Sequence, residues 1–192
     1  MTNSEDHDSW GEWWDARVAA MEPVLGKVHD MVGHAPVPFQ FGPDVGGAAD
    51  VIYFKHHIDG VVSVTSELIG CDEQVPNDLG NYELMICHRD DEAWGASLIS
   101  RLAHYTLEAR LDPGETMDIG PAAPEGSTIA AFLFFNYAQF EVKGEEAGLL
   151  LCVGITAEEL ELCHAGERER VERRLKAAKI YPFTDLYRES VL

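Results

Sequence analysis

The spacing of hydrophobic residues changes several times along the chain and predicts an alternation of helices and strands. Ser9 and Glu12 have the spacing of a capping box, and Pro23 falls within or near the end of the helix that would follow. A stripe at helical spacing runs through this helix, formed by Trp10, Trp13, Trp14, Val18 and Met21. We expect the stripe to dock on the core, with a partner-binding groove as the alternative.

Short runs of β-branched and aromatic residues predict strands. Val51–Phe54 and Val61–Thr65 are joined by a segment that ends in Asp59-Gly60, a strong signal for a hairpin turn. A further apolar strand is predicted at Tyr82–Cys87. Two more runs are apolar on both faces, as in central strands that are covered on both sides, namely Ile129–Phe135 and Leu149–Val153. The polar segment Gly70–Gly80 predicts a loop that points outward.

A central helix is predicted after the Tyr82–Cys87 strand. Asp90 or Asp91 is placed to cap its N-terminus. One face is apolar through Trp94, Leu98, Leu102 and Tyr105. Asp112-Pro113-Gly114 is expected to stop this helix before a second short strand.

Two helices are predicted near the C-terminus. Thr156 and Glu159 form a second capping box, and Gly166 stands where that helix would end. Glu167–Lys179 predicts a charged helix with a narrow apolar stripe. The tail is expected to anchor the C-terminus by burying Leu186 and Tyr187.

These elements predict an α+β fold in a single domain, a mixed β-sheet with helices packed against it. A chain of 192 residues most simply forms one domain with one sizeable core. We expect residues 1–35 to form an N-terminal helix and loop, and residues 50–192 to form the core region. The predicted core residues are Trp94, Leu98, Leu102, Phe132, Phe134, Leu150 and Leu160.

Composition adds one strong signal, a formal net charge of −20 at pH 7. Such an acidic surface argues against nucleic-acid binding, which needs cations to displace counterions, and against adsorption to anionic membranes. It would speed the approach of a basic protein partner. On charge alone, solubility is the simpler explanation.

Other bulk features favour a cytoplasmic location. No apolar run approaches the roughly 20 residues that span a bilayer. The acidic, polar first ten residues do not resemble a secretory signal. We therefore expect the cysteines to be reduced thiols without a disulfide or a structural metal, at Cys71, Cys87, Cys152 and Cys163.

Candidate chemistry is limited to cysteine and histidine. Cys87-His88 lies in a predicted strand, where neighbouring side chains point to opposite faces. Cys163-His164 lies late in a helix, where the dipole opposes thiolate formation. No zinc-ligand spacing, nucleophile elbow, phosphate loop or dinucleotide motif is present. We therefore predict no catalytic residue, no metal and no cofactor.

The run from Tyr82 to Gly120 has the order strand, charged turn, helix with Trp94, polar corner and short strand, and it resembles the suppressor-of-fused family. The resemblance covers about two-thirds of the chain as a pattern of strands and helices. It continues through Ile129–Phe135, Gly154–Gly166 and the tail Phe183–Arg188. The chain departs from the family pattern at Thr65-Ser66-Glu67, where Thr-x-Gly is expected.

The resemblance implies a mixed sheet with helices and a role in binding proteins. Animal members restrain zinc-finger transcription factors by clamping an extended peptide between two domains, in a β-strand-addition mode. The chain resembles only the first of those domains, so we do not expect the animal function here. Bacterial single-domain members have been proposed as immunity proteins that neutralise toxins, several of them nucleases with a cationic cleft.

We therefore favour a non-catalytic protein-binding module, an immunity or antitoxin-like protein that sequesters a basic toxin partner. The alternative is a small cytoplasmic enzyme with a Cys/His site, which a convergent, solvent-reachable Cys-His pair in a cleft would support. The expected partner-binding carboxylates lie in predicted turns, at Asp72, Glu73, Asp78, Asp90, Asp91, Glu92, Glu145 and Glu146. The oligomeric state is left open.

Overall fold

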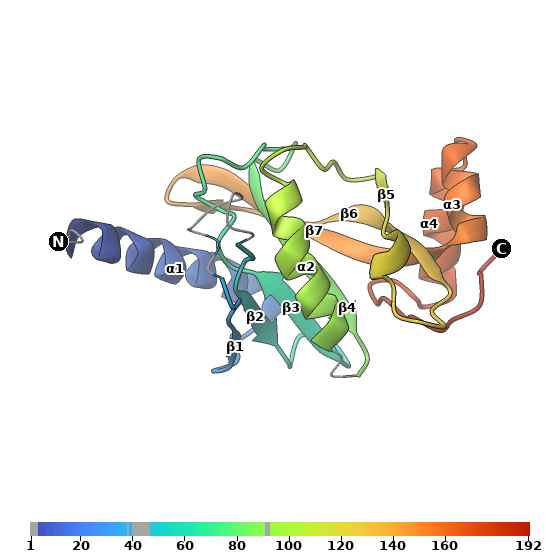
Figure 1. The fold of residues 1–192 in the computed structure, drawn as a ribbon, viewed down its shortest axis with the longest axis horizontal. Helices are drawn as coiled ribbons and strands as arrows, with labels where there is room; N and C mark the ends of the chain where they lie inside the picture. Colours follow the sequence, from blue (N-terminus) through green and yellow to red (C-terminus); the bar gives the residue numbers. More distant parts are fainter. Residues whose placement is uncertain (1–3, 38, 40–46, 91–92) are drawn as a thin grey trace.

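One seven-stranded sheet organises the chain, with helices on both of its faces (Figure 1). The computed structural model describes residues 4–37, 39, 47–90 and 93–192, apart from the side chains of residues 4–10 and 121. The strands are β1 (Val32–Gly33), β2 (Val51–Phe54), β3 (Val61–Thr65), β4 (Asn81–His88), β5 (Thr116–Asp118), β6 (Ile129–Val142) and β7 (Glu145–Thr156). The helices are α1 (Ser4–Leu25), α2 (Ala93–Tyr105), α3 (Ala157–His164) and α4 (Arg168–Ala177), with a 3-10 turn at Gly120–Ala122.

The strands lie in the order β1-β2-β3-β4-β7-β6-β5, and of these neighbouring pairs only β4 with β7 is parallel. α2 crosses one face of the sheet, whereas α1, α3 and α4 pack on the other (Figure 1). The predicted α+β class, a mixed sheet with helices packed on it, is confirmed. The strands predicted at 51–54 and 61–65 have the predicted bounds.

Alternation along the central strands sends side chains into two apolar layers. In β4, Leu84 and Ile86 face the α2 layer, while Met85 and Cys87 face the layer under α1 and α4. β6 alternates in the same way. The nearly continuous apolar runs predicted for these strands thus reflect a sheet that is covered on both sides.

Most of the predicted core residues are buried. The α2 layer contains Leu98, Leu102, Phe132, Phe134 and Leu150. Trp94 is only half-buried at the margin of that layer, where its Nε1 donates a hydrogen bond to the Ala122 carbonyl at 2.9 Å. Leu160 is also half-buried and packs against the opposite layer.

The β6–β7 hairpin is longer than the apolar runs predict. Its turn consists of Lys143 and Gly144, with φ of 52° and 86°. Positive φ at both turn residues matches the twist of a two-stranded ribbon. Glu145 and Glu146 therefore begin β7, and the prediction that they lie in a turn is wrong. The far half of the hairpin mixes polar and apolar residues, so it carries no continuous apolar run.

Two helix boundaries also differ from the predicted ones. α1 begins at Ser4, so Ser9 lies inside the helix and does not cap its start. α2 ends at Tyr105 instead of continuing to the Asp112-Pro113-Gly114 corner. Thr106 ends it, because its hydroxyl and its N–H both donate to the Ala103 carbonyl, at 2.7 and 3.1 Å. Such local side-chain bonds compete with helix propagation.

The Gly70–Gly80 segment packs against the end of the sheet and does not point outward as predicted. Gln74 is buried. Its side chain accepts the Tyr82 N–H at 3.0 Å and donates to the Tyr82 carbonyl at 2.9 Å, as a neighbouring strand would. This bond pair holds the loop, with its exposed carboxylates, in a fixed place beside β4.

One buried arginine ties α1 to the sheet. Arg17 is 5% exposed, and it donates through Nε to the Ile69 carbonyl at 2.7 Å and through Nη1 to the Ser66 carbonyl. Buried Glu83 accepts the N–H groups of Leu68 and Ile69, both at 2.9 Å, from the same turn. The turn after β3, where the sequence departs from the family pattern, is therefore the segment to which Arg17 binds α1.

The C-terminal segment fills the gap where β4 and β7 separate. Their pairing ends at Met85 and Leu151. Beyond that point, the Thr184 N–H donates to the Cys87 carbonyl at 2.8 Å, and its Oγ1 accepts the Gly154 N–H at 2.9 Å. The tail thus continues the contact between the two central strands.

A buried ion pair locks this tail. Arg188 donates to both carboxylate oxygens of Glu159 at 2.5 and 2.6 Å, with side chains 4% and 0% exposed. Glu159 also forms the predicted capping box with Thr156, which is confirmed. Leu186 is buried as predicted, but Tyr187 is 61% exposed, because Arg188 takes the inward position.

Arg188→Met should lower the free energy of unfolding by about 3–5 kcal/mol at pH 7, because it leaves a buried carboxylate without its cation. Burial alone would raise the pKa of Glu159, but hydrogen bonds from Arg188 and from backbone N–H groups hold it below its usual value. A lowered native pKa adds stability above the unfolded pKa and loses it as pH falls through the native value. The cost of Arg188→Met should therefore shrink in acid, as urea unfolding at pH 7 and pH 4 would show.

The matched control is Arg170→Met, which breaks an ion pair whose side chains are each 48% exposed. We expect this control to cost less than about 1 kcal/mol. Equal losses for the two variants would contradict a special role for the Arg188–Glu159 pair.

Glu67→Gln should make stability less dependent on pH. Burial, together with the Asp50 and Glu83 carboxylates, raises the pKa of Glu67 from 4.5 to about 7, against the opposing hydrogen bond from the Asp50 N–H. Because the native pKa exceeds the unfolded one, the folded chain keeps a proton that the unfolded chain releases, and stability falls as pH rises between those values. The glutamine retains an acceptor for the Asp50 N–H, so it should stabilise the protein above pH 7 and flatten this decline.

Urea unfolding at several pH values between 4.5 and 8 measures this effect, with exposed Glu73→Gln as the control. Parallel pH profiles for the Glu67 variant and the unchanged protein would show that Glu67 has no such role.

Candidate protein-binding surface

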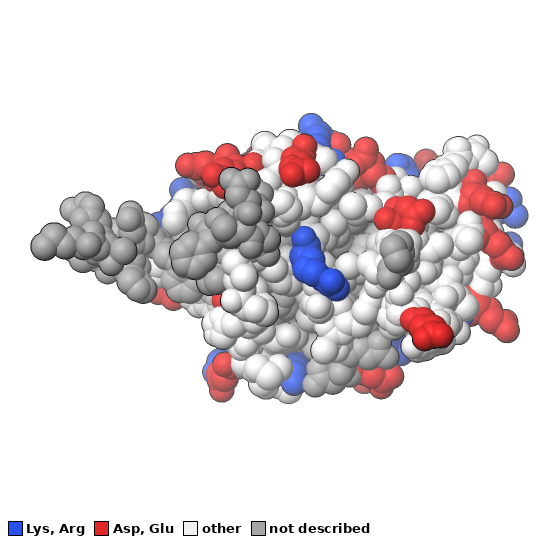
Figure 2. Space-filling model, in the orientation of Figure 1, with Lys and Arg blue, Asp and Glu red and all other residues white. Residues whose placement is uncertain are grey.

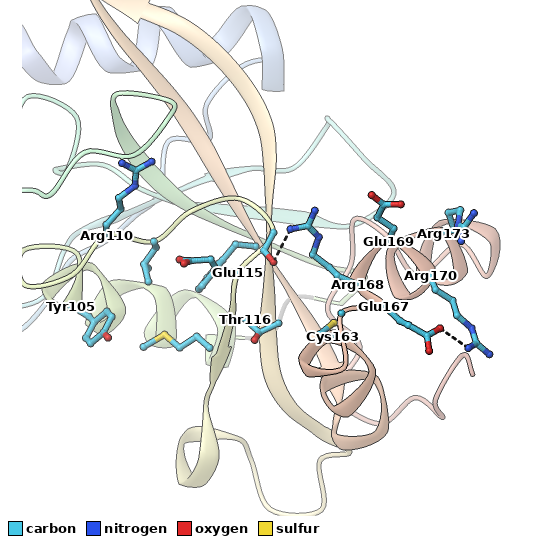
Figure 3. A pocket seen from close by; sticks show the side chains of 15 residues that line it. Tyr105, Arg110, Glu115, Thr116, Cys163, Glu167, Arg168, Glu169, Arg170 and Arg173 are labelled. Atoms are coloured by element: carbon cyan, nitrogen blue, oxygen red, sulfur yellow. Dashed lines mark hydrogen bonds and ion pairs between the residues drawn. The ribbon is translucent and has the colours of Figure 1, made fainter.

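A groove of about 860 Å³ lies between β5 and the α3–α4 pair (Figure 3). Buried Leu111 and Phe134 contribute apolar surface to it. Tyr105 and Arg110 lie at the end nearer α2, and Arg168 and Arg173 at the end formed by α4. Exposed tyrosine and arginine beside apolar surface are the residue types that dominate the energetics of protein interfaces.

The groove runs along an edge of the sheet. β5 is the last strand in the sheet order, and it pairs with β6 through Met117↔Phe132. The Ile119 N–H donates to the Ala130 carbonyl at 3.0 Å, which sets the alternation of the ladder. In this alternation the backbone groups of Thr116 and Asp118 point away from β6. The outer edge of β5 is therefore available for pairing with an extended segment.

Ion pairs fix the walls of the groove. Arg168 pairs with Glu172 at 3.1 Å and reaches across to the Gly114 carbonyl at 3.4 Å (Figure 3). Gly114 has φ of +89°, and a Cβ there would lie 2.1 Å from the Arg168 guanidinium. Arg170 pairs with Glu167 at 2.8 Å. Of these contacts, the hydrogen bond from Arg168 to Gly114 joins α4 to the segment just before β5.

The structure brings together five of the predicted partner-binding carboxylates at one end of the sheet. Asp72, Glu73 and Asp78 are exposed in the Gly70–Gly80 loop, and Glu145 and Glu146 are exposed at the start of β7. The two segments touch, since a Cβ on Gly80 would lie 1.9 Å from the Glu146 carbonyl. We call these five side chains the acidic end. In Figure 2, acidic side chains gather over the β6–β7 hairpin and near α3–α4, whereas a basic side chain lies over the middle of α2.

The other three predicted carboxylates do not join this cluster in the described structure. Asp90 is exposed just after the end of β4, a full strand length from the acidic end. Asp91 and Glu92 lie outside the described residues.

The acidic end adjoins the groove through an arginine that the sequence did not single out. Arg110 lines the groove and pairs with Asp78 and with Asp112, each at 2.6 Å. Tyr105, Glu115 and Thr116 were likewise not predicted as site residues. For Glu115 and Thr116 the only sequence signal was a short strand predicted after the Pro-Gly corner, since edge strands are often short.

The neighbouring Cys87 and His88 side chains lie on opposite faces of the sheet and do not converge. Cys87 faces the α1 and α4 layer, while His88 contacts the Trp94 ring on the opposite face, at 6.2 Å between ring centroids. Burial raises the pKa of the Cys87, Cys152 and Cys163 thiols, which disfavours the nucleophilic thiolate. Among the described residues, no group of three histidine, cysteine or acidic side chains could hold a metal ion.

The fold and the groove define a class of protein, an α+β domain with an open sheet edge beside a groove. The chain belongs to the suppressor of fused protein (SUFU) family, whose model matches residues 49–189. The resemblance inferred from the order of elements is confirmed. No curated protein sequence matches the chain. None of the helices in the described part of the chain is long and apolar enough to cross a membrane.

Solved structures share this fold. A suppressor of fused homologue from Neisseria gonorrhoeae FA 1090 has a TM-score of 0.68 at 18% identity, covering 95% of this chain and 98% of that one. The match in the Sufu–Fu complex has a TM-score of 0.69 at 12% identity, covering 96% and 91%. Drosophila Suppressor of Fused gives 0.52 at 11% identity, covering 83% of this chain and 42% of that protein.

Proposed function

We propose that this chain is a non-catalytic protein-binding module that sequesters a basic protein partner. The observation that carries the proposal is the acidic end, a cluster of five exposed carboxylates that continues through Asp78 and Arg110 into the groove beside β5. Membership of the suppressor of fused family supports a binding role, since a match to this fold is found in a complex with Fu.

Electrostatics give the acidic end a defined task. A formal net charge of −20 attracts a cationic surface at long range, and a local cluster of carboxylates directs the encounter to one end of the sheet. Such steering acts mainly on the association rate and weakens as salt is added. A basic partner is therefore expected to bind quickly at low salt.

The groove supplies the short-range part of the interaction. An extended segment of the partner can pair with the outward backbone groups of Thr116 and Asp118, while its side chains contact Tyr105 and the wall of α4. Backbone pairing supplies affinity with little demand on sequence, and the side-chain contacts supply selectivity.

We further propose an immunity-like role, in which the basic partner is a toxin. This reading rests on the immunity role proposed for bacterial single-domain members of the family, and a bacterial homologue shares the fold over nearly the whole of both chains. The alternative, a cytoplasmic enzyme with a Cys/His site, finds little support in thiols whose burial raises their pKa.

Neutralising the acidic end should slow capture of the partner. The test variant carries Asp72→Asn, Glu73→Gln, Glu145→Gln and Glu146→Gln. At low salt we expect its association rate with the partner recovered from the source cell to fall at least about fivefold, with little effect at high salt. Surface plasmon resonance on the recovered partner measures both rates.

The matched control neutralises four exposed carboxylates elsewhere, with Asp59→Asn, Asp90→Asn, Glu125→Gln and Glu161→Gln. Equal slowing in both variants would assign the effect to net charge and not to the acidic end. Recovery of no partner, together with turnover of a small molecule that a single Cys or His substitution abolishes, would favour the enzyme.

Thr116→Pro should block the proposed pairing at β5. The Thr116 N–H points away from β6, so proline removes an outward donor without breaking the ladder, and its ring obstructs a neighbouring strand. We expect partner affinity to fall at least about tenfold while the melting temperature stays within a few degrees. Thr116→Ala, which keeps the N–H, serves as the control, and unchanged affinity in the proline variant would place the interface elsewhere.

A further inference from the structure

A second pocket, of about 170 Å³, opens between the segment after α1 and the β2–β3 turn. It is lined by Lys27, Val28, His29, Asp30, Lys55 and His56. Basic residues are scarce in this chain, which has 14 lysines and arginines against 34 acidic residues. Two of the five lysines nevertheless line this one pocket together with two histidines and a single carboxylate.

Contacts of the surrounding chain hold the walls of the pocket. The His29 N–H donates to the Tyr53 carbonyl at 2.8 Å, which fixes the segment after α1 against β2. The Val28 N–H donates to Glu22 Oε1 at 3.2 Å. On the other wall, His57 Nε2 lies 2.5 Å from the Tyr137 hydroxyl and ties the β2–β3 turn to β6. The basic side chains therefore project from two anchored segments.

The pocket is lined by potential hydrogen-bond donors from two lysines and two histidines, with Asp30 as its one carboxylate. His29 Nδ1 accepts the Met31 N–H at 3.1 Å, so the neutral ring carries its proton on Nε2 and donates from there. A lysine ammonium carries three donors and a compact positive charge, although Lys55 also has another contact. Such a donor set matches a ligand whose exposed atoms are all acceptors and which carries negative charge.

The net charge of the protein does not prevent anion binding at this place. Charges further away than about 8 Å are largely screened at physiological ionic strength, so the nearby lysines dominate inside the pocket. The acidic end is remote, because the β2–β3 turn lies beside the end of β4, where Val61 pairs with His88, and the acidic end lies at its start. Lysines on a surface often serve solubility alone, but here two of them line one concave site together with two histidines.

We propose that this pocket binds a phosphate group, either as free inorganic phosphate or as a phosphomonoester. Lysine is a common ligand for phosphate because its point charge needs no fixed hydrogen-bond geometry. The tetrahedral oxyanion would accept hydrogen bonds from Lys27, Lys55 and His29 Nε2. This site is separate from the proposed protein partner and does not depend on it.

Titration of the full chain with inorganic phosphate, followed by 1H–15N correlation spectra at constant ionic strength, tests the proposal. We expect saturable shifts at the amides of His29, Asp30 and His56. Lys27→Gln combined with Lys55→Gln should raise the apparent Kd at least about tenfold, since each lysine would contribute a charge-assisted hydrogen bond. Because Lys55 has other contacts, Lys27→Gln alone is a second variant, for which we expect a rise of at least about threefold.

The control combines Lys143→Gln with Lys179→Gln, which removes the same charge outside the pocket and should leave the Kd unchanged. Glycerol 2-phosphate in a parallel titration distinguishes a monoester from the free ion, and saturation by either supports the site. Shifts that grow linearly with phosphate, that chloride reproduces, or that persist unchanged in both pocket variants would overturn the proposal.

Discussion

The parallel pairing of β4 with β7 is the contact on which the rest of the structure depends. It joins the antiparallel group β1–β4 to the antiparallel group β5–β7. Two parallel neighbours cannot be linked by a tight turn, so α2, β5 and β6 all lie between them in the sequence. Where the two strands separate, Thr184 bridges them and Arg188 binds Glu159. We call the β4–β7 pairing, together with this continuation through the C-terminal tail, the seam. Nearly every helix packs against strands that this seam holds in place.

The seam also decides which charges meet. Because β4 and β7 run in the same direction, their first residues lie side by side, and the loop before β4 touches the start of β7 at Glu146. The carboxylates of these two segments therefore form one acidic end, and Asp90, after the far end of β4, stays apart from them. Arg110 then connects Asp78 to the groove along β5. A surface suited to steering and a surface suited to strand pairing thus become neighbours.

The sequence predicted correctly those elements that depend on a few adjacent residues. The β2–β3 hairpin and the Thr156–Glu159 capping box follow from a few adjacent residues, and both are found as predicted. The misses have non-local or competing causes. Gln74 takes the place of a strand neighbour for Tyr82, and Thr106 ends α2 early through its own hydroxyl. No periodicity of apolar residues encodes bonds of this kind.

By itself, the sequence determined the α+β class, the run of strands and helices, the acidic character and the absence of a reactive motif, because each depends on composition or short-range spacing. The tertiary structure decided which carboxylates share a surface, where the sheet is left open, and that lysines and histidines from two distant segments line one pocket. Glu159 illustrates the difference. Its capping role follows from the four residues Thr156–Glu159, whereas its ion pair with Arg188 forms only because the C-terminal tail folds back beside β4 and β7. Contacts between distant segments depend on strand order and direction, which hydrophobic spacing leaves undetermined.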